Sequence, residues 1–571
     1  MKTQTVEILK SAFKKVLNEL DCPIEDKTYG VKKTELGHGD YASRIALSLT
    51  KMYKTHPHTI ATNIAERLKS NLDPSIYAIE VAIPGYINIR LSDQALLENL
   101  TQILNEKQKY CSEFIDDPRV HVVEYSSPNI AKPFTIGHLR STIIGDSIAR
   151  ILIHCGYRVV RDNHLGDWGT QFGKMMVALK KWGNLEKIKN SVNPVKDLVD
   201  LYQRFHKESK EEEKNGNNFL ITQAREWFVS LENGDTEARS LWKFCVDLSM
   251  MEFNKIYQRL GINFDTYLGE SFFEDKMHLI FTDMREKGIG QESEGALVIF
   301  FPEDILPPLL VRKNDGSTLY ATRDLATDLY RIKRYGGDVV IINEVGKEQT
   351  QYFQQIYTAE QMLGYFEKDQ RIHIKHGLYR FPEGKMSTRE GNVIWLEEVL
   401  DEAVEKALSL CNNDRTSAEI IAMGAIKFND LVRDPENDIS FSWEKILNMK
   451  GDSGPYIQYT AVRIASLIQK AFKEDMRVPV TVSFLTVRDN DRKVLRILEG
   501  FFESLENARK NYSTGPIATY LIKLCREYNK YYTTVNIIND RNVTGLTISM
   551  AVREIIELGL NLLGIKIPEK M

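Results

Sequence analysis

The sequence predicts an α/β protein in which a parallel sheet follows a small α/β unit and precedes a helical bundle. A β-rich run at 120–125 is followed by a loop, a helical pattern at 139–154 and a second β-rich run at 157–161. Strand, loop, helix and strand in this order open a Rossmann-like parallel sheet. After about residue 395, apolar residues recur almost only at helical spacing, which is typical of a bundle.

The first domain is predicted to span residues 1–115 and to contain both helices and strands. Apolar residues recur at helical spacing between residues 8 and 20, which predicts a first helix. Alternating apolar residues at 79–83 and 85–89 predict two strands. The Asp-Asp-Pro run at 116–118 indicates the boundary with the next domain.

The second domain is predicted to span residues 116–400 and the third, wholly helical, residues 401–571. Further buried strands are expected at 296–300 and 338–342, where β-branched and other apolar residues are continuous. A mostly helical stretch at about 183–275 is expected to interrupt the sheet.

Composition limits the class of protein. Hydrophobic residues make up 43% and charged residues 27%, which is typical of a globular chain. No apolar run is long enough to span a bilayer. The six cysteines include no CxxC pair, so we expect a cytoplasmic protein with no protein-bound metal. The net charge of −4 neither indicates nor excludes a nucleic-acid partner, because basic residues can gather on one face.

The loop before the 139–154 helix carries residues suited to binding phosphate. Gly137 would let a nucleotide lie against the backbone, and His138 could donate a hydrogen bond at the helix start. The helix N-terminus adds N–H groups and partial positive charge, and Lys132 is a nearby cation. The alternative is that Gly-His only opens and caps a helix.

A second short segment, Lys385-Met386-Ser387, follows a turn-forming run at 381–384. A lysine on a mobile loop could reach the β- and γ-phosphates of a nucleotide and then withdraw. The alternative is an ordinary surface lysine.

Together these segments resemble the HIGH and KMSK signatures of class I aminoacyl-tRNA synthetases. The runs 124–132, 137–146 and 163–173 closely resemble arginyl-tRNA synthetases, and the resemblance covers nearly the whole chain. Five further runs are similar to that family's N-terminal additional domain, arginine pocket and anticodon-binding domain: 37–42 and 84–88, 319–324, and 454–459 with 563–571.

The resemblance implies an ATP-dependent ligase. Such an enzyme activates L-arginine as arginyl-adenylate and transfers it to the 3′-terminal adenosine of tRNA(Arg) for protein synthesis, with Mg²⁺ accompanying ATP. We expect it to act as a monomer.

The resemblance also assigns residues to roles. Lys132, Gly137, His138, Lys385 and Ser387 are catalytic candidates. The ATP-binding candidates are Thr135, Gly137, His138, Lys385, Met386 and Ser387. The arginine-binding candidates are Glu124, Asn129, Tyr320, Asp324 and Gln349, and the tRNA-binding candidates are Asn88, Tyr456, Tyr459 and Met571. Thr135 departs from the family, which often has histidine at that position.

Several simpler interpretations stay open at this point. Asp324 could cap a helix, Glu124 could be a satisfied carboxylate at a strand end, and the tyrosines of the third domain could belong to its core. At the level of function, the alternatives are a small-molecule nucleotidyltransferase of related fold and a non-catalytic tRNA-binding paralogue.

Overall fold

The computed structural model describes residues 5–22, 29–34, 39–302, 305–314, 318–380, 394–478 and 482–571. The chain divides into two compact units. The terminal unit contains Met1–Phe114, Asn448–Asn561 and Lys566–Met571. The central unit contains Ile115–Leu447 and Leu562–Ile565. No helix among the described residues is long and apolar enough to cross a membrane.

The N-terminal part of the terminal unit is built on a four-stranded antiparallel sheet in the order β1-β2-β4-β3. Its strands are β1 (Val31–Lys33), β2 (Tyr41–Ser43), β3 (Tyr77–Ala82) and β4 (Tyr86–Leu91), which places strands where alternation predicted them. Its helices are α1 (Thr5–Glu19), α2 (Ile45–Tyr53), α3 (Pro57–Asn71), α4 (Asp93–Glu106) and the short η1 (Lys107–Lys109). Helix α1 buries the face that the apolar spacing defined.

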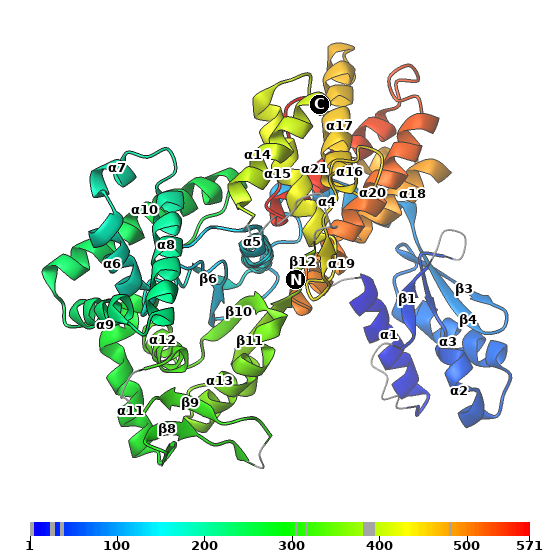
Figure 1. Cartoon of the computed structure of the whole chain (residues 1–571). Coiled ribbons are helices and arrows are strands. Elements are labelled where there is room, and N and C mark those ends of the chain that lie inside the picture. The colour runs from blue at the N-terminus through cyan, green and yellow to red at the C-terminus, as the bar shows by residue number, and fades with distance from the viewer. Residues whose placement is uncertain are drawn as a thin grey trace. The chain divides into compact units, whose positions relative to one another are not determined.

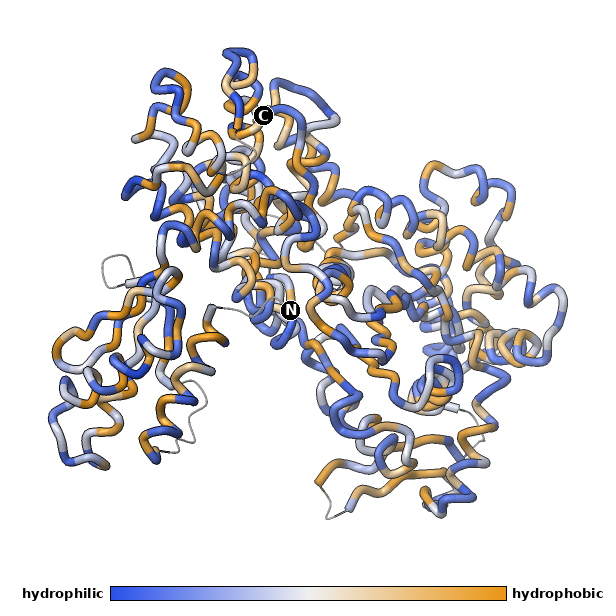
Figure 2. Tube along the Cα trace, turned by 180° about the vertical axis from the view of Figure 1, so that it is seen from behind, coloured by the Kyte–Doolittle hydropathy of each residue, from blue (hydrophilic) through white to orange (hydrophobic). Residues whose placement is uncertain are grey.

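The rest of the terminal unit is helical. It contains α17 (Gly454–Lys473), η7 (Val482–Phe484), α18 (Asp489–Glu499), α19 (Phe501–Lys510), α20 (Gly515–Thr534) and most of α21 (Val543–Leu562). Hydrophobic and hydrophilic residues alternate along the helical turns (Figure 2). Amphipathic helices of this kind pack their apolar stripes together.

The central unit is organised around a four-stranded sheet in the order β11-β10-β5-β6, all parallel (Figure 1). Its strands are β5 (Val120–Glu124), β6 (Arg158–Asp162), β10 (Val340–Gly346) and β11 (Arg371–His376). Glu124 pairs in register with Asp162 on one side and with Asn343 on the other. Polar side chains therefore meet at one edge of the sheet, where ligands bind in open α/β folds.

Helix α5 (Ile136–Cys155) connects β5 to β6 and starts three residues before the predicted start. It ends at Gly156, whose φ of 110° lies in the left-handed region that glycine adopts readily. A Cβ atom at Gly145 would lie 2.2 Å from Cβ of Tyr125, so glycine lets the helix approach the chain that leaves β5.

Residues 296–300 form a strand, but they do not join the parallel sheet. β7 (Gln291–Ser293), β8 (Ala296–Ile299) and β9 (Leu309–Arg312) make a separate antiparallel sheet. The two residues between β7 and β8, Glu294 and Gly295, have φ values of 51° and 79°. A two-residue hairpin of this type returns the chain beside itself, which explains the antiparallel pairing.

The predicted insertion is a helical group with its own small core. It comprises α6 (Gln171–Trp182), α7 (Leu185–Lys189), α8 (Pro194–Lys214), α9 (Phe219–Glu232) and α10 (Thr236–Leu260). Val177, Phe205 and Leu220 lie at the centre of this core. The charged run at 207–214 is the last part of α8.

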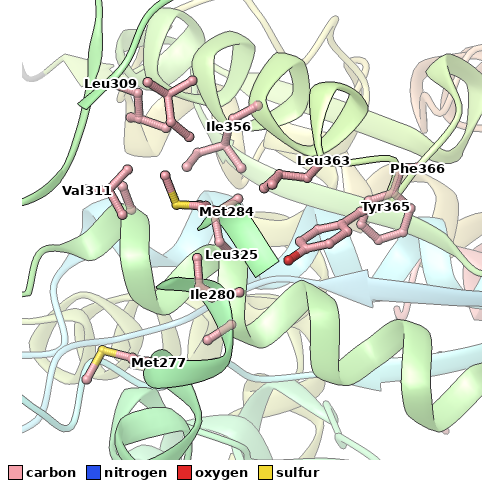
Figure 3. Close-up of a cluster of buried hydrophobic side chains, with 14 of the residues drawn as sticks. Met277, Ile280, Met284, Leu309, Val311, Leu325, Ile356, Leu363, Tyr365 and Phe366 are labelled. Carbon is pink, nitrogen blue, oxygen red and sulfur yellow. The ribbon is translucent and has the colours of Figure 1, made fainter. Parts of the chain in front are cut away.

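A larger core of buried hydrophobic side chains includes Val122 and Ile341 of the parallel sheet and residues of the helices beside it (Figure 3). It joins α11 (Met277–Glu286), α12 (Tyr320–Tyr335), α13 (Thr350–Met362) and β9, with η2 (Glu270–Lys276), η4 (Lys347–Gln349) and η5 (Lys368–Gln370) as short connections. Ile280, Leu325 and Ile356 are fully buried there. The core therefore fixes α12 and α13 against the sheet.

The helices that follow β11 in the chain also belong to the central unit. They are α14 (Leu396–Ala407), η6 (Leu408–Leu410), α15 (Arg415–Leu431) and α16 (Trp443–Ile446), with β12 (Tyr379–Arg380) paired to β13 (Ile439–Ser440). Arg140 of α5 and Asp430 of α15 form a fully buried ion pair of 3.1 Å. The domain boundary expected near residue 400 thus falls inside this unit, which continues to Leu447.

Candidate active site

A cavity of about 640 Å³ lies at the carboxyl edge of the parallel sheet. Its lining includes Glu124, Asn129, Thr135, Gly137, His138, Tyr320, Asp324 and Gln349. Residues from four separate parts of the sequence therefore surround one space. The sequence predicted these eight residues for ATP and arginine.

His138 combines a structural and a chemical function at the start of α5. Its Nδ1 accepts the backbone N–H of Thr135 at 3.0 Å, as the acidic residue of a capping box would. A nitrogen that accepts an N–H carries no proton, so the neutral ring holds its proton on Nε2. Burial lowers the pKa of His138, which keeps the ring neutral at pH 7. The site thus gains an Nε2–H donor, and Thr135 serves as the N-cap residue.

Gly137 is not required by the packing of the protein itself. An added Cβ would meet only Oγ1 of Thr135, at an ordinary 3.4 Å. Gly137 is also exposed at the cavity wall. The open space in front of Gly137 fits a nucleotide that lies against the first turn of a helix.

The loop between β5 and α5 has an unusual and well-held backbone. Ser126, Ser127 and Ala131 have φ values of 72°, 43° and 56°. The loop N–H groups are bound by side chains: Ser126 N donates to Ser141 Oγ at 2.9 Å and Ser127 N to Asn163 Oδ1 at 3.1 Å. Left-handed conformations of non-glycine residues persist where the surroundings fix them, and they cluster at ligand sites.

Helix α12 presents Tyr320 and Asp324 to the cavity, one turn apart. Tyr320 is the first residue of the helix and its side chain is exposed. Asp324 lies in the second turn, so it does not cap this helix. Tyr352 of α13 donates a hydrogen bond to Oδ2 of Asp324. Burial raises the pKa of Asp324 to about 6.

Glu124 is held by a buried arginine that sequence reasoning missed. Arg331 of α12 contacts Glu124 and Asp162 at 2.5 Å each and Asp328 at 2.9 Å. Arg371 in turn binds Asp328 at 2.8 Å. The Glu124 carboxylate is thus partly satisfied by the protein, as the simpler interpretation had it, yet it still lines the cavity.

We call Glu124, Glu270, Asp324 and Asp328, which all line the cavity, the carboxylate cage. Asp162 and Glu360 bind the same two arginines, so four carboxylates contact Arg331 or Arg371, while Glu270 and Asp324 form no ion pair with either. Negative charge is in excess, which favours a cationic ligand.

Glu270 is a second residue that sequence reasoning missed. Its side chain is buried, and its Oε2 has no hydrogen-bond partner among the described residues. Burial raises its pKa to about 7. An unpartnered buried carboxylate at a cavity wall is a strong position for a cationic ligand. The available signal was its place in a polar run, Gly269-Glu270-Ser271, just before an apolar pair.

Other predicted residues are placed less centrally. Gln349 lies just before α13 at the cavity edge, and Asn129 lies in the strained loop. Lys132 is exposed and does not line the cavity. Lys385, Met386 and Ser387 lie outside the described residues. No group of His, Cys, Asp and Glu suited to a metal ion occurs in the described part of the chain.

The terminal unit contains a second cavity of about 610 Å³ between α17 and the segment after α20. Tyr459 and Met571 line it, together with Arg463, whose guanidinium stacks on the Tyr532 ring at 3.9 Å. Tyr456 does not line this cavity, since its hydroxyl accepts a hydrogen bond from Asn529. Asn88 is half-buried within β4.

A parallel sheet whose first crossover helix carries Gly-His in its first turn, beside a polar cavity, fits a class I aminoacyl-tRNA synthetase. Comparison with protein families agrees. Residues 99–443 match the model for tRNA synthetases class I (R), catalytic domain. Residues 457–571 match the DALR anticodon binding domain, and residues 7–91 the arginyl tRNA synthetase N terminal domain.

Individual proteins give the same result. The arginine–tRNA ligase of Clostridioides difficile is 37% identical and covers 93% of this chain and 94% of its own length. Arginine–tRNA ligase 2 of Bacillus anthracis is 38% identical over the full length of both chains. The chain therefore belongs to the arginyl-tRNA synthetase family, as its sequence motifs indicated.

Solved structures support the fold independently. The arginyl-tRNA synthetase of Thermus thermophilus matches with a TM-score of 0.79 at 23% identity, over 100% of both chains. That of Plasmodium falciparum matches with a TM-score of 0.80 at 24% identity, over 99% of both chains. The predicted fold class is confirmed, and the alternative of a small-molecule nucleotidyltransferase finds no support.

Proposed function

We infer that this chain is an arginine–tRNA ligase that activates L-arginine with ATP and transfers it to the 3′-terminal adenosine of tRNA(Arg). Full-length identity to arginine–tRNA ligases supports the reaction. The observation that carries the choice of amino acid is the carboxylate cage, because an excess of buried negative charge selects a guanidinium.

Arginine would enter with its guanidinium toward Asp324 and Glu270. Asp324 accepts from Tyr352 through Oδ2, which leaves Oδ1 for the substrate. Tyr320 would cover the side chain from the helix start, and Glu124, Asn129 and Gln349 would receive the α-ammonium end.

Activation is the attack of the arginine carboxylate on the α-phosphorus of ATP, with pyrophosphate as the leaving group. No enzyme nucleophile is needed, so the protein's contribution is positioning and stabilisation of phosphate charge. His138 would donate through Nε2–H, and the first turn of α5 would add its N–H groups. Lys132, Lys385 and Ser387 are proposed to act on the β- and γ-phosphates, with Met386 beside the nucleotide and Mg²⁺ arriving as part of the ATP complex.

The second cavity is proposed to receive anticodon bases of tRNA(Arg). Stacked rings and guanidinium groups are good platforms for unstacked bases, and Tyr459, Arg463 and Tyr532 offer them. Tyr456 would then act by holding Asn529, and Asn88 would contact the tRNA elbow from the N-terminal sheet.

The proposed domains are the N-terminal additional domain at 1–115, the catalytic domain at 116–400 and the anticodon-binding domain at 401–571. We further propose that the chain acts as a monomer. The six cysteines are buried and form no disulfide bond in the described part of the chain, which supports a reducing compartment such as the cytoplasm.

The decisive experiment is aminoacylation of total tRNA with each labelled amino acid in turn. We expect charging with arginine alone and a matching loss of ATP. Charging with another amino acid, or none with any, would reject the proposal and return the non-catalytic paralogue to consideration.

Replacing Gly137 by alanine should weaken ATP binding without unfolding the chain. The added methyl group meets no protein atom closer than 3.4 Å but occupies the space proposed for the nucleotide. We expect the KM for ATP to rise about tenfold, which corresponds to about 1.4 kcal/mol. The KM for arginine and the melting temperature should change little, and an unchanged KM for ATP would contradict the nucleotide position.

The KM for arginine should rise as pH falls. The carboxyls of Glu270 and Asp324, with pKa values raised to about 7 and about 6, bind a guanidinium only when ionised. Protonation therefore weakens binding first below pH 7 and more steeply below pH 6, by up to about tenfold per pH unit for each group. Initial rates between pH 5 and 8 measure this, and an unchanged KM would contradict the assignment.

A further inference from the structure

His164 lies in the run Asn163-His164-Leu165-Gly166-Asp167, to which the proposed mechanism gives no function. The residue follows β6 directly and lines the active-site cavity. Its ring packs near Phe273, with ring centroids 5.7 Å apart. The ring therefore lies at the wall of the proposed arginine pocket.

One ring nitrogen of His164 has a fixed protonation state. Nδ1 lies 2.8 Å from the backbone oxygen of Leu268, and a carbonyl oxygen can only accept. Nδ1 must therefore carry a proton whatever the charge of the ring. The charge depends on Nε2 alone, which has no hydrogen bond to the described residues.

The surroundings of His164 are strongly acidic. Charged groups face it from β5, β6, its own loop, η2 and α12: Glu124, Asp162, Asp167, Glu270, Asp324 and Arg331. Five of these six are carboxylic acids. Burial by itself lowers the pKa of His164, but the nearby carboxylates outweigh it and raise the pKa above its ordinary value.

Arg331 and Arg371, which already bind some of these acids, do not remove the excess of negative charge. Arg331 contacts Glu124, Asp162 and Asp328, and Asp324 receives only the neutral hydroxyl of Tyr352. A proton on Nε2 supplies positive charge that interacts favourably with Asp324 and Glu124 in the absence of substrate. An arriving guanidinium or ammonium group would be repelled by that same charge.

We propose that His164 is a further arginine-binding residue, which carries a proton on Nε2 in the absence of arginine and releases that proton to water when the cationic substrate enters the carboxylate cage. The bond that breaks is Nε2–H, and its electron pair stays on the nitrogen. Neutral Nε2 then accepts a hydrogen bond from the substrate. A neutral isostere such as L-citrulline offers no charge to displace the proton, so His164 should keep its proton when L-citrulline binds. This inference rests on the proposed function.

Calorimetry of L-arginine binding to the full chain tests the inference. Titrations at pH 6.5 to 7.5 in buffers of different ionisation enthalpy give the number of protons released. His164→Asn is the key variant, because the asparagine amide can still donate to Leu268 while the Nε2 position is lost. His278→Asn, at an exposed histidine outside the cavity, is the matched control.

We expect wild type and His278→Asn to release the same number of protons, and His164→Asn to release less by about half or more. The KM for arginine should rise about tenfold in His164→Asn with kcat nearly unchanged, because the acceptor Nε2 is lost. Equal proton release in all three proteins would overturn the inference. Absence of any arginine binding by wild type would instead overturn the proposed function.

A second measurement needs no variant. Nitrogen chemical shifts of ¹⁵N-labelled histidines report directly whether a ring nitrogen carries a proton. Among the histidines of the wild-type protein, we expect one ring to lose a proton on addition of L-arginine and not of L-citrulline. If no histidine changes its state, the inference is wrong even where His164→Asn does not fold.

Discussion

Asp324→Asn should raise the KM for arginine by roughly 30-fold to more than 1000-fold. Asparagine has nearly the same shape and can still accept the hydrogen bond from Tyr352, so the change removes charge and little else. Losing one partner of a desolvated ion pair costs on the order of 2–5 kcal/mol. The KM for ATP should stay within about twofold. Steady-state aminoacylation with each substrate varied in turn measures both constants.

Asp338→Asn is a suitable control for this prediction. Asp338 is an exposed acid in the loop after α12, so the same chemical change is made outside the cavity. It should leave both constants unchanged. If Asp324→Asn moved the constants for arginine and ATP together, Asp324 would be supporting the fold of α12 and not binding the substrate.

His138→Asn should lower the rate of arginyl-adenylate formation by about 100-fold to 1000-fold. The asparagine oxygen can take the place of Nδ1 and accept the Thr135 N–H, so the start of α5 is preserved. The Nε2–H donor is lost, and one such donor to transition-state charge is worth roughly 3–4 kcal/mol. Single-turnover activation in the presence of tRNA measures the rate.

Two comparisons separate this catalytic function from helix capping. His138→Ala removes both the cap and the donor, so it should lower the melting temperature as well as the rate. His138→Asn should lower the rate alone, with the affinity for arginine nearly intact. A wild-type rate in His138→Asn would show that the ring only caps the helix.

Local sequence patterns were sufficient to predict the central βαβ unit. The runs around β5 and β6 are rich in valine, and glycine marks the end of α5, so each element was set by its own residues. The start of α5 was predicted three residues late, because a histidine ring provides the capping acceptor. The strand expected at 296–300 is present as β8, but its antiparallel partners could not be predicted because pairing depends on the tertiary fold.

The same distinction applies to the active site. Gly137 and His138 could be predicted since they follow a strand and open a helix within one short segment. Arg331 and Glu270 could not, because a charged residue on a helix usually faces solvent. Only the tertiary fold brings Glu124, Asp162 and Asp328 around the Arg331 guanidinium and leaves Glu270 without a partner.

The sharing of carboxylates by Arg331 and Arg371 constrains how this enzyme could be adapted to a non-natural amino acid in an expanded genetic code. Neutralising Asp324 alone would leave the other carboxylates in place. The pocket would therefore still favour a cationic side chain over an uncharged one. Removing Asp328 would take away the acid that Arg331 and Arg371 share, and breaking a buried ion pair costs about 3–5 kcal/mol. Single-site libraries would therefore be dominated by unstable variants. Libraries that exchange an arginine and its acidic partner together offer a viable evolutionary route.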